Sequence, residues 1–239
     1  MTLLRVAHLT KNFGGLRAVS DLSFDLAQGE LLGLIGPNGA GKTTAFNLMS
    51  GSITPSAGNV ELSGEDIVGL KPHAVVRRGI ARTFQIVKPF RRLPVLENVT
   101  LAAFLREPNR AKAEAEAARI LEGVNLGSKR GSLASDLTLG EQKRLEIARA
   151  LATRPKILFL DEPMGGLNPA EIDHACELVM RIRGSGVTVI LIEHHMKAIM
   201  RIADRVIVLH HGVKIADAAP REIVRDAEVI KAYLGERAV

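Results

Sequence analysis

Cysteine and large aromatic residues are almost absent from this sequence. Cys176 is the only cysteine, and the 239 residues include one tyrosine and no tryptophan. A single cysteine excludes a disulfide within the chain and a thiolate metal cluster, and it suits a reducing compartment. Proteins that bind single-stranded nucleic acid stack bases on aromatic side chains, which are scarce here. We therefore expect Cys176 to be a packing residue, and we expect no nucleic-acid partner.

A membrane-spanning segment is also lacking. No apolar stretch approaches the roughly 20 residues that cross a bilayer, and the longest strong run, 187–192, has the length of a strand. The first ten residues lack the basic, apolar and small-residue order of a signal peptide. We therefore expect a cytoplasmic protein. Its net charge of +6 comes from Lys and Arg spread along the chain, which favours a mildly basic solvated surface.

The most informative motif present lies between an apolar run and a helical segment. It has the P-loop spacing Gly-x-x-x-x-Gly-Lys-Thr and consists of Gly36, Pro37, Asn38, Gly39, Ala40, Gly41, Lys42, Thr43 and Thr44. A glycine-rich turn leaves backbone N–H groups free to surround phosphate oxygens, and a helix opening at Lys42 directs its positive end toward them. Lys42 adds a positive charge, the Thr43 hydroxyl can bind Mg²⁺, and Thr44 lies within reach of phosphate.

Apolar runs that alternate with helical patterns indicate an α/β protein. Runs typical of strands covered on both faces of a parallel sheet occupy residues 30–35, 156–160, 187–192 and 205–209. Residues 3–26 and 58–63 alternate apolar and polar side chains between glycine-rich turns, which indicates antiparallel strands beside that sheet. The pattern from 94 to 154 is helical, and we interpret this segment as an inserted lobe.

Two acids follow one of the apolar runs. Asp161 and Glu162 lie where the carboxyl end of a buried strand would deliver them, the edge at which open α/β sheets bind ligands. Asp161 would hold Mg²⁺ directly or through water, and Glu162 would orient and deprotonate the water that attacks the γ-phosphate. Such acids can also belong to an ordinary solvated turn, but the P-loop in the same chain favours the catalytic interpretation.

A helix start near Thr138 is a further candidate anion site. Thr138 and Glu141 have the Thr-x-x-Glu spacing of a capping box, which is a structural feature in its own right. The free N–H groups of a helix start also bind anions. If this helix faced the nucleotide of a second subunit, Thr138, Leu139, Gly140 and Glu141 could hold its γ-phosphate.

The order of these motifs resembles that of the ATP-binding cassette (ABC) ATPase family over nearly the whole chain. The family order is the P-loop, Gln85 after a strand, the helix start at 137–142, the acids at 160–163, and His194 after the next strand. The resemblance implies that Phe13 stacks on adenine, that Gln85 senses Mg²⁺ and the attacking water, and that His194 contacts the γ-phosphate. ATP and Mg²⁺ are the implied cofactors, and Thr43, Gln85 and Asp161 are the implied metal-binding residues.

The same resemblance implies an ABC ATPase fold in one domain over residues 1–239. A RecA-like P-loop NTPase core with an antiparallel β subdomain would comprise residues 1–93 and 155–239, and a helical subdomain would comprise 94–154. Three positions depart from the family pattern. Asn168 stands where many relatives carry Asp, and Thr138 replaces the usual Ser but keeps a hydroxyl. Leu139 stands where a Gly is usual, which affects how closely that loop can approach phosphate.

Longer motifs resemble one subfamily, the ATPases of branched-chain amino acid importers. These motifs occupy residues 13–19, 80–85, 166–171, 192–196 and 232–236. The resemblance implies two ATPase subunits, identical or sister chains, paired head to tail on the inner face of the cell membrane. It also implies permease subunits that dock near residues 85–92, and indirectly a solute-binding protein.

Two other classes remain open at this point. A motor that exports lipid or extracts lipopolysaccharide is also a single cassette with a similar Tyr-Leu-Gly tail. A soluble ABC ATPase that acts on nucleic acid or ribosomes generally carries two cassettes or a long coiled-coil insertion, and this chain has neither. The motifs at 13–19, 80–85 and 192–196 favour the importer over the lipid motor.

Overall fold

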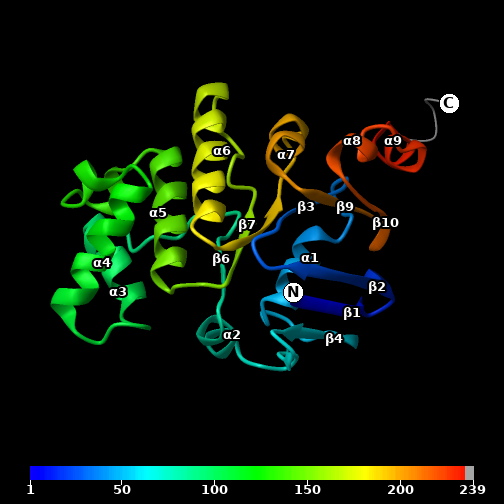
Figure 1. Ribbon diagram of the computed structural model, residues 1–239, viewed down its shortest axis with the longest axis horizontal. Coiled ribbons are helices and arrows are strands. Elements are labelled where there is room, and N and C mark those ends of the chain that lie inside the picture. The colour runs from blue at the N-terminus through cyan, green and yellow to red at the C-terminus, as the bar shows by residue number, and fades with distance from the viewer. Residues whose placement is uncertain (235–239) are drawn as a thin grey trace.

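The larger of two β-sheets forms the centre of the molecule. The computed structural model describes residues 1–234, and within them this sheet has six strands in the order β10-β9-β3-β8-β7-β6 (Figure 1). Neighbouring strands pair in parallel except β10, which pairs antiparallel with β9. The strands are β3 (Leu31–Ile35), β6 (Ile80–Arg82), β7 (Ile157–Asp161), β8 (Thr188–Ile192), β9 (Arg205–His210) and β10 (Val213–Ala218). The predicted parallel sheet is confirmed.

The second sheet is antiparallel and has the order β2-β1-β4-β5. Its strands are β1 (Thr2–Phe13), β2 (Leu16–Ala27), β4 (Ala57–Leu62) and β5 (Glu65–Asp66). Helix α1 (Lys42–Met49) packs in one apolar cluster with residues of both sheets. The rings of Phe46 in α1 and Phe159 in β7 lie 5.0 Å apart within this cluster. The buried helix therefore holds the P-loop at the boundary of the two sheets.

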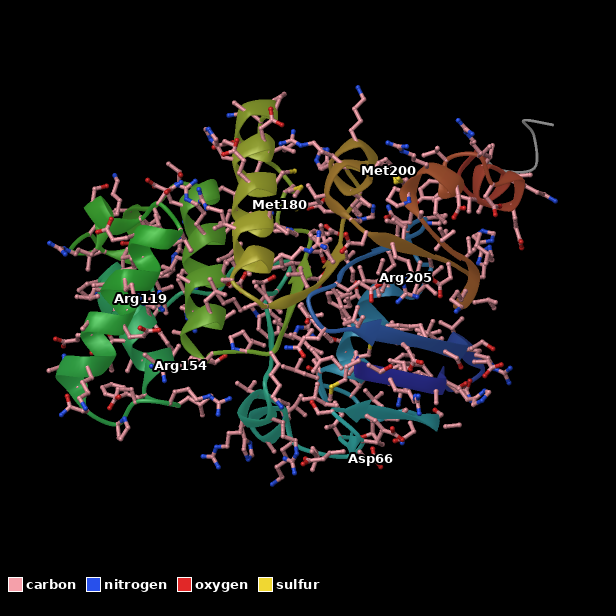
Figure 2. The ribbon with its side chains drawn as sticks, in the orientation of Figure 1. Asp66, Arg119, Arg154, Met180, Met200 and Arg205 are labelled. Atoms are coloured by element: carbon pink, nitrogen blue, oxygen red, sulfur yellow. The ribbon has the colours of Figure 1, made fainter. Side chains whose placement is uncertain are left out.

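The helical lobe lies at one end of the molecule, and the antiparallel sheet lies at the other (Figure 1). Alanines such as Ala113, Ala117 and Ala148 are fully buried in the lobe, which lets its helices approach closely. Arg119 and Arg154 lie on this lobe, far from Asp66 of the antiparallel sheet (Figure 2). Its helices are α3 (Val95–Ala103), α4 (Arg110–Gly123) and α5 (Leu139–Ala152). The helices expected in 94–154 are therefore present, and the domain boundaries at 93 and 154 stay a prediction.

The remaining helices surround the core. They are α2 (Pro72–Arg78), α6 (Pro169–Gly184), α7 (Met196–Ile202), α8 (Pro220–Ile223) and α9 (Ala227–Leu234). Cys176 of α6 is buried, and burial raises the pKa of its thiol, as suits a packing residue. Across residues 1–234 no helix has both the length and the apolar character needed to cross a membrane. Residues 235–236 of the C-terminal motif lie outside the described residues.

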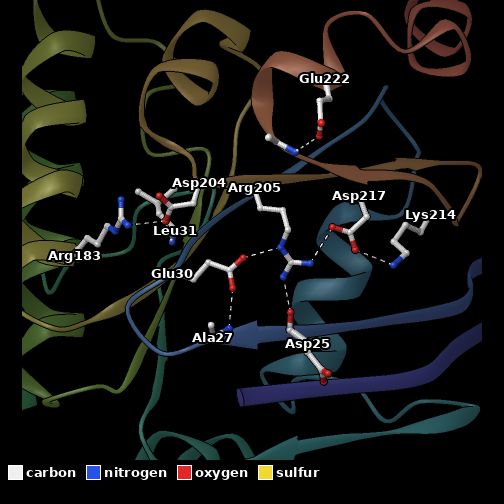
Figure 3. Close-up of polar contacts among 11 residues, drawn as sticks. Asp25, Ala27, Glu30, Leu31, Arg183, Asp204, Arg205, Lys214, Asp217 and Glu222 are labelled. Carbon is white, nitrogen blue, oxygen red and sulfur yellow. Dashed lines mark hydrogen bonds and ion pairs between the residues drawn. The ribbon is translucent and has the colours of Figure 1, made fainter. Parts of the chain in front are cut away.

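A polar cluster around Arg205 joins the two sheets (Figure 3). The guanidinium of Arg205 donates to Glu30 at 2.7 Å, to Asp217 at 2.9 Å, and to the backbone oxygen of Asp25 in β2. Lys214 donates to the second carboxylate oxygen of Asp217 at 2.9 Å. Because one planar cation contacts β2, β10 and the residue just before β3, the edge of the core sheet is fixed against the antiparallel sheet.

Candidate nucleotide-binding site

A pocket of about 900 Å³ opens where the strands of the core sheet end. Its walls include P-loop residues 38–44, Glu162 after β7 and His194 after β8. Phe13 from the end of β1 and Gln85 from the segment after β6 complete the set. The structure thus brings together, around one cavity, predicted residues that are far apart in the sequence, at the carboxyl edge where α/β sheets bind ligands.

The backbone conformation of the P-loop requires two glycines. Gly36 and Gly41 have φ angles of 150° and 97°, and a Cβ on either would collide with a backbone carbonyl oxygen. The Lys42 ammonium lies inside the loop and donates to the carbonyls of Gly36 at 2.8 Å and Pro37 at 2.9 Å. Burial lowers the pKa of Lys42, and the nearby charges of Glu162 and Asp161 oppose that shift. The loop therefore presents a buried cation to the pocket.

Glu162 is held between two other predicted residues. Its Oε1 lies 2.7 Å from Nε2 of His194, and its Oε2 accepts a hydrogen bond of 2.9 Å from the Gln85 amide. The backbone of Glu162 has φ 50°, in the left-handed region that a residue with a Cβ rarely adopts. Such backbone strain is typical of functional sites. This arrangement directs a carboxylate into the pocket, and the catalytic roles of the three residues stay predictions.

The surroundings of Asp161 fit a divalent cation. Its carboxylate is buried, with one oxygen 3.4 Å from the Arg82 guanidinium and the other, Oδ1, buried without a hydrogen-bond partner among the described residues. Burial raises the pKa of Asp161, while Arg82 lowers it. Thr43, Gln85 and Asp161 all line a second groove of about 720 Å³ that adjoins the P-loop. A hydroxyl, an amide and a carboxylate are the oxygen donors that Mg²⁺ prefers.

Protein ligands alone would not complete such a site. Within residues 1–234 no group of three or more His, Cys, Asp or Glu side chains is placed to hold a metal ion. Mg²⁺ commonly binds through one or two carboxylates together with substrate phosphates. The structure is therefore compatible with a cation that arrives with a nucleotide, and Mg²⁺ stays a prediction.

The helix start at Thr138 lies outside this pocket. The capping box is confirmed, because the Thr138 hydroxyl accepts from the Glu141 N–H at 3.3 Å and the Glu141 carboxylate accepts from the Thr138 N–H at 2.9 Å. None of residues 138–141 lines the P-loop pocket, and the Leu139 side chain is 48% exposed. A phosphate role for Thr138, Leu139, Gly140 and Glu141 would need a second subunit and stays a prediction.

Asn168 has a local function that the motif comparison did not predict. Its side chain accepts from the Glu171 N–H at 3.0 Å, and Glu171 accepts from the Asn168 N–H at 2.9 Å. These bonds form a second capping box, at the start of α6. Because an asparagine oxygen caps a helix as well as an aspartate does, the substitution leaves this end of α6 intact.

Three charged residues at the site were missing from the sequence prediction. Arg82 pairs with Asp161 and donates to Asn47 of α1 at 2.7 Å. Glu193 is buried beside His194, and Lys143 of α5 donates to the Glu162 carbonyl at 2.7 Å. Glu193 directly follows the apolar run at 187–192, and this position could have marked it as a site residue. Lys143 gave no such signal, because its partner is distant in the sequence.

Comparison with known proteins identifies the family. A family model described as ABC transporter matches residues 19–165. The high-affinity branched-chain amino acid transport ATP-binding protein BraF of Pseudomonas aeruginosa is 43% identical over 98% of both chains. The chain belongs to the ABC transporter family. The prediction of an ABC ATPase that binds nucleotide is confirmed.

Other relatives agree with this assignment. The LivG protein of Salmonella typhimurium, named as a high-affinity branched-chain amino acid transport ATP-binding protein, is 43% identical over 98% of both chains. A model described as branched-chain amino acid ATP-binding cassette transporter matches residues 213–239 of this ABC ATPase. The lipopolysaccharide export ATP-binding protein LptB of Escherichia coli is 37% identical over 99% of this chain and 98% of its own.

Solved structures confirm the predicted fold class. The ADP conformation of an ATP-binding cassette of an ABC transporter matches with a TM-score of 0.90 and 29% identity, over 99% of this chain and 100% of the other. A nucleotide-free ATP-binding cassette matches with a TM-score of 0.88 and 29% identity over the same shares. This chain therefore has the ABC ATPase fold, with its antiparallel subdomain and helical lobe.

Proposed function

We propose that this ABC ATPase is the ATP-hydrolysing subunit of an importer for branched-chain or related amino acids. The observation that carries the proposal is sequence similarity, along the whole chain, to proteins named for branched-chain amino acid transport. Two relatives named for branched-chain amino acid transport are 43% identical over 98% of the chain, and residues 213–239 match a model of that same transporter group. The nucleotide motifs are common to the whole family, so the C-terminal match is the more discriminating support.

The geometry supports hydrolysis by an activated water. Glu162 orients the water and accepts its proton, since its carboxylate faces the pocket between His194 and Gln85. His194 stabilises charge on the γ-phosphate from the opposite wall, and Lys42 does so from the P-loop. Mg²⁺, when bound, neutralises charge on the phosphates. Thr43, Gln85 and Asp161 are the residues that would hold it.

The helix start at Thr138 supports a site shared by two subunits. We expect two ATPase subunits, identical or sister chains, to pair head to tail so that each ATP lies between one P-loop and the opposite 138–141 segment. The free N–H groups of that capped helix then contact the γ-phosphate. Hydrolysis converts ATP into two negatively charged products that repel each other. The two subunits then separate, and this opening is the motion that drives a transporter.

The groove beside the P-loop supports the permease contact expected near residues 85–92. Phe84, Ile86 and Phe90 are large apolar side chains exposed at or beside this groove, and Lys88 adds positive charge. Exposed apolar anchors with a polar rim are typical of protein interfaces. We infer peripheral attachment to the inner face of the membrane through permease subunits, with a solute-binding protein as an indirect partner.

The experiment that tests this proposal is reconstitution. The protein is co-expressed with the permease subunits of a branched-chain amino acid importer, and ATPase activity is measured in proteoliposomes with and without leucine-loaded binding protein. Stimulation by leucine, and its loss in a Glu162→Gln variant, would support an amino acid importer. Co-purification with a lipopolysaccharide-transport bridge would instead favour the second candidate, to which the 37% identity with LptB points.

A further inference from the structure

The Glu162 backbone is held from two directions. Its left-handed φ of 50° is unfavourable for a residue with a Cβ, and such a conformation persists only where neighbouring groups fix it. The Glu162 N–H donates to the Ile192 carbonyl of β8 at 3.0 Å. Its carbonyl accepts a hydrogen bond of 2.7 Å from the ammonium of Lys143. Lys143 follows directly after the helix start at 137–142 and was not among the residues predicted for the site.

Lys143 connects this carbonyl to the helical lobe. It lies on α5, the helix that begins beside Thr138, and its side chain is partly buried. Burial lowers the pKa of Lys143, and the charges of Glu193, Glu162 and Glu146 oppose this shift. A hydrogen bond from an ammonium to a carbonyl is stronger than one between neutral groups. A movement of α5 would therefore displace the carbonyl of Glu162.

Glu193 connects the two turns that carry the predicted catalytic side chains. Its side chain is 1% exposed, and its Oε1 accepts from the Met164 N–H at 2.6 Å. Its Oε2 accepts from the N–H groups of His194 at 3.0 Å and His195 at 3.4 Å. A buried carboxylate is tolerated only when it is hydrogen-bonded in this way. The turn after β7 and the turn after β8 are thereby joined through one side chain.

We propose that Lys143 and Glu193 are positioning residues for Glu162. Lys143 makes the orientation of Glu162 depend on the helical lobe, and Glu193 keeps Glu162 within reach of His194. The pair forms a link between lobe and pocket in addition to Gln85. This inference rests on the proposed catalytic role of Glu162.

The first test is Lys143→Met, which removes the donor and keeps most of the apolar stem. Lys112→Met is the matched control, since Lys112 is an exposed residue of α4 in the same lobe. We expect kcat for ATP hydrolysis to fall about tenfold or more, because small displacements of catalytic groups have large effects. We expect KM for ATP and the melting temperature to stay within error of the control. An unchanged kcat, or a loss of kcat that follows a loss of stability, would overturn the proposal.

The second test separates this inference from the proposed function. Lys143→Met is combined with Glu162→Gln, and the residual rates of the single and double variants are compared. A residue that acts only through Glu162 adds no further loss in the Glu162→Gln background. A further loss in the double variant would overturn the positioning role. Full activity of Glu162→Gln alone would instead refute the catalytic role of Glu162, whatever Lys143 does.

Glu193→Gln provides an independent test of the second residue. The amide keeps one acceptor but turns a donor toward backbone N–H groups, so the two turns can no longer be joined by a single side chain. We expect a selective fall in kcat as for Lys143→Met, with nucleotide affinity retained. Parent-like kcat in a folded Glu193→Gln variant would show that Glu193 does not position Glu162.

Discussion

The P-loop pocket and the helix start at Thr138 both suit an anion, but they are built differently. The pocket gathers side chains from the ends of several strands around a buried lysine. The Thr138 segment lies outside the pocket, with its own capping box and an exposed leucine. This difference supports the proposal that the predicted catalytic groups lie in one region and that the other region contacts a second subunit.

The largest effect should come from Lys42→Ala, which disables the pocket. Removing a buried cation that faces the phosphates should lower nucleotide affinity by about 100-fold or more and abolish turnover. Titration with a fluorescent ATP analogue measures the affinity. Lys112→Ala, in the solvated face of α4, serves as the control. Tight nucleotide binding by Lys42→Ala would mean that the pocket is not where ATP binds.

Leu139→Glu should disable the surface and spare the pocket. A carboxylate at this helix start would repel the γ-phosphate of the opposite subunit, since like charges brought close in a dry interface are strongly unfavourable. We expect parent-like nucleotide affinity in the monomer, with no ATP-dependent dimer and about 100-fold less turnover. Light scattering and steady-state hydrolysis check both parts. Parent-like dimerisation of Leu139→Glu would contradict the shared site.

Mixing these two variants tests whether one site is built from both regions. A head-to-tail dimer of one Lys42→Ala chain and one Leu139→Glu chain contains one site in which both halves are intact. Activity should therefore reappear when the two inactive proteins are mixed. Each variant mixed with itself at the same total concentration is the control. A mixture as inactive as its components would count against sites built from two chains.

Glu146 of helix α5 should have a smaller effect, on the pH dependence of stability. Burial raises the pKa of this α5 side chain from 4.5 to about 7, against smaller opposing effects of the Phe84 N–H, Arg149, Lys143 and Arg82. Because the folded-state pKa is raised, the folded protein binds the proton more tightly, and stability falls as pH rises from about 4.5 to about 7.

Glu146→Gln mimics the protonated carboxyl and should remove that dependence. We expect the variant to melt about 3 °C or more above the parent at pH 8, and the gain to shrink as pH approaches 5. Glu122→Gln, at an exposed position of α4, is the control. Equal melting curves of parent and Glu146→Gln across this range would refute the raised pKa.

The smallest effect concerns the cap of α5. Thr138→Ala removes the acceptor for the Glu141 N–H, which should destabilise the nucleotide-free protein by about 1 kcal/mol. Thr138→Ser keeps the hydroxyl and should preserve stability. Urea unfolding measures both variants. A Thr138→Ala protein as stable as the parent would show that the cap contributes nothing outside the shared site.

Local patterns predicted most of the fold and the P-loop, whereas Phe13, Gln85 and His194 were predicted from the family resemblance. The runs at 30–35 and 205–209 became β3 (Leu31–Ile35) and β9 (Arg205–His210), because strands buried on both faces must be apolar throughout. The P-loop is also local, since its glycines and its helix are adjacent in the chain. The short β6 and the edge strand β10 gave no comparable run, because one has only three residues and the other keeps its side chains partly exposed.

The contacts that surround the predicted catalytic residues could not be predicted in this way. Lys143 and Glu162 are 19 residues apart, and Arg82 and Asp161 are 79 apart. Their pairing depends on how the helical lobe and β6 pack against β7, which no periodicity reveals. The sequence could predict candidate catalytic groups, whereas the groups that contact them emerged only from the three-dimensional arrangement.

In the proposed mechanism, ATP completes its site by bringing a second chain to the P-loop pocket. The most direct measurement is the solution mass of Glu162→Gln by light scattering, with bound nucleotide quantified in the same sample. With Mg·ATP we predict a dimer that retains ATP, and with Mg·ADP a monomer. A Glu162→Gln protein that binds ATP fully and stays monomeric would contradict this mechanism.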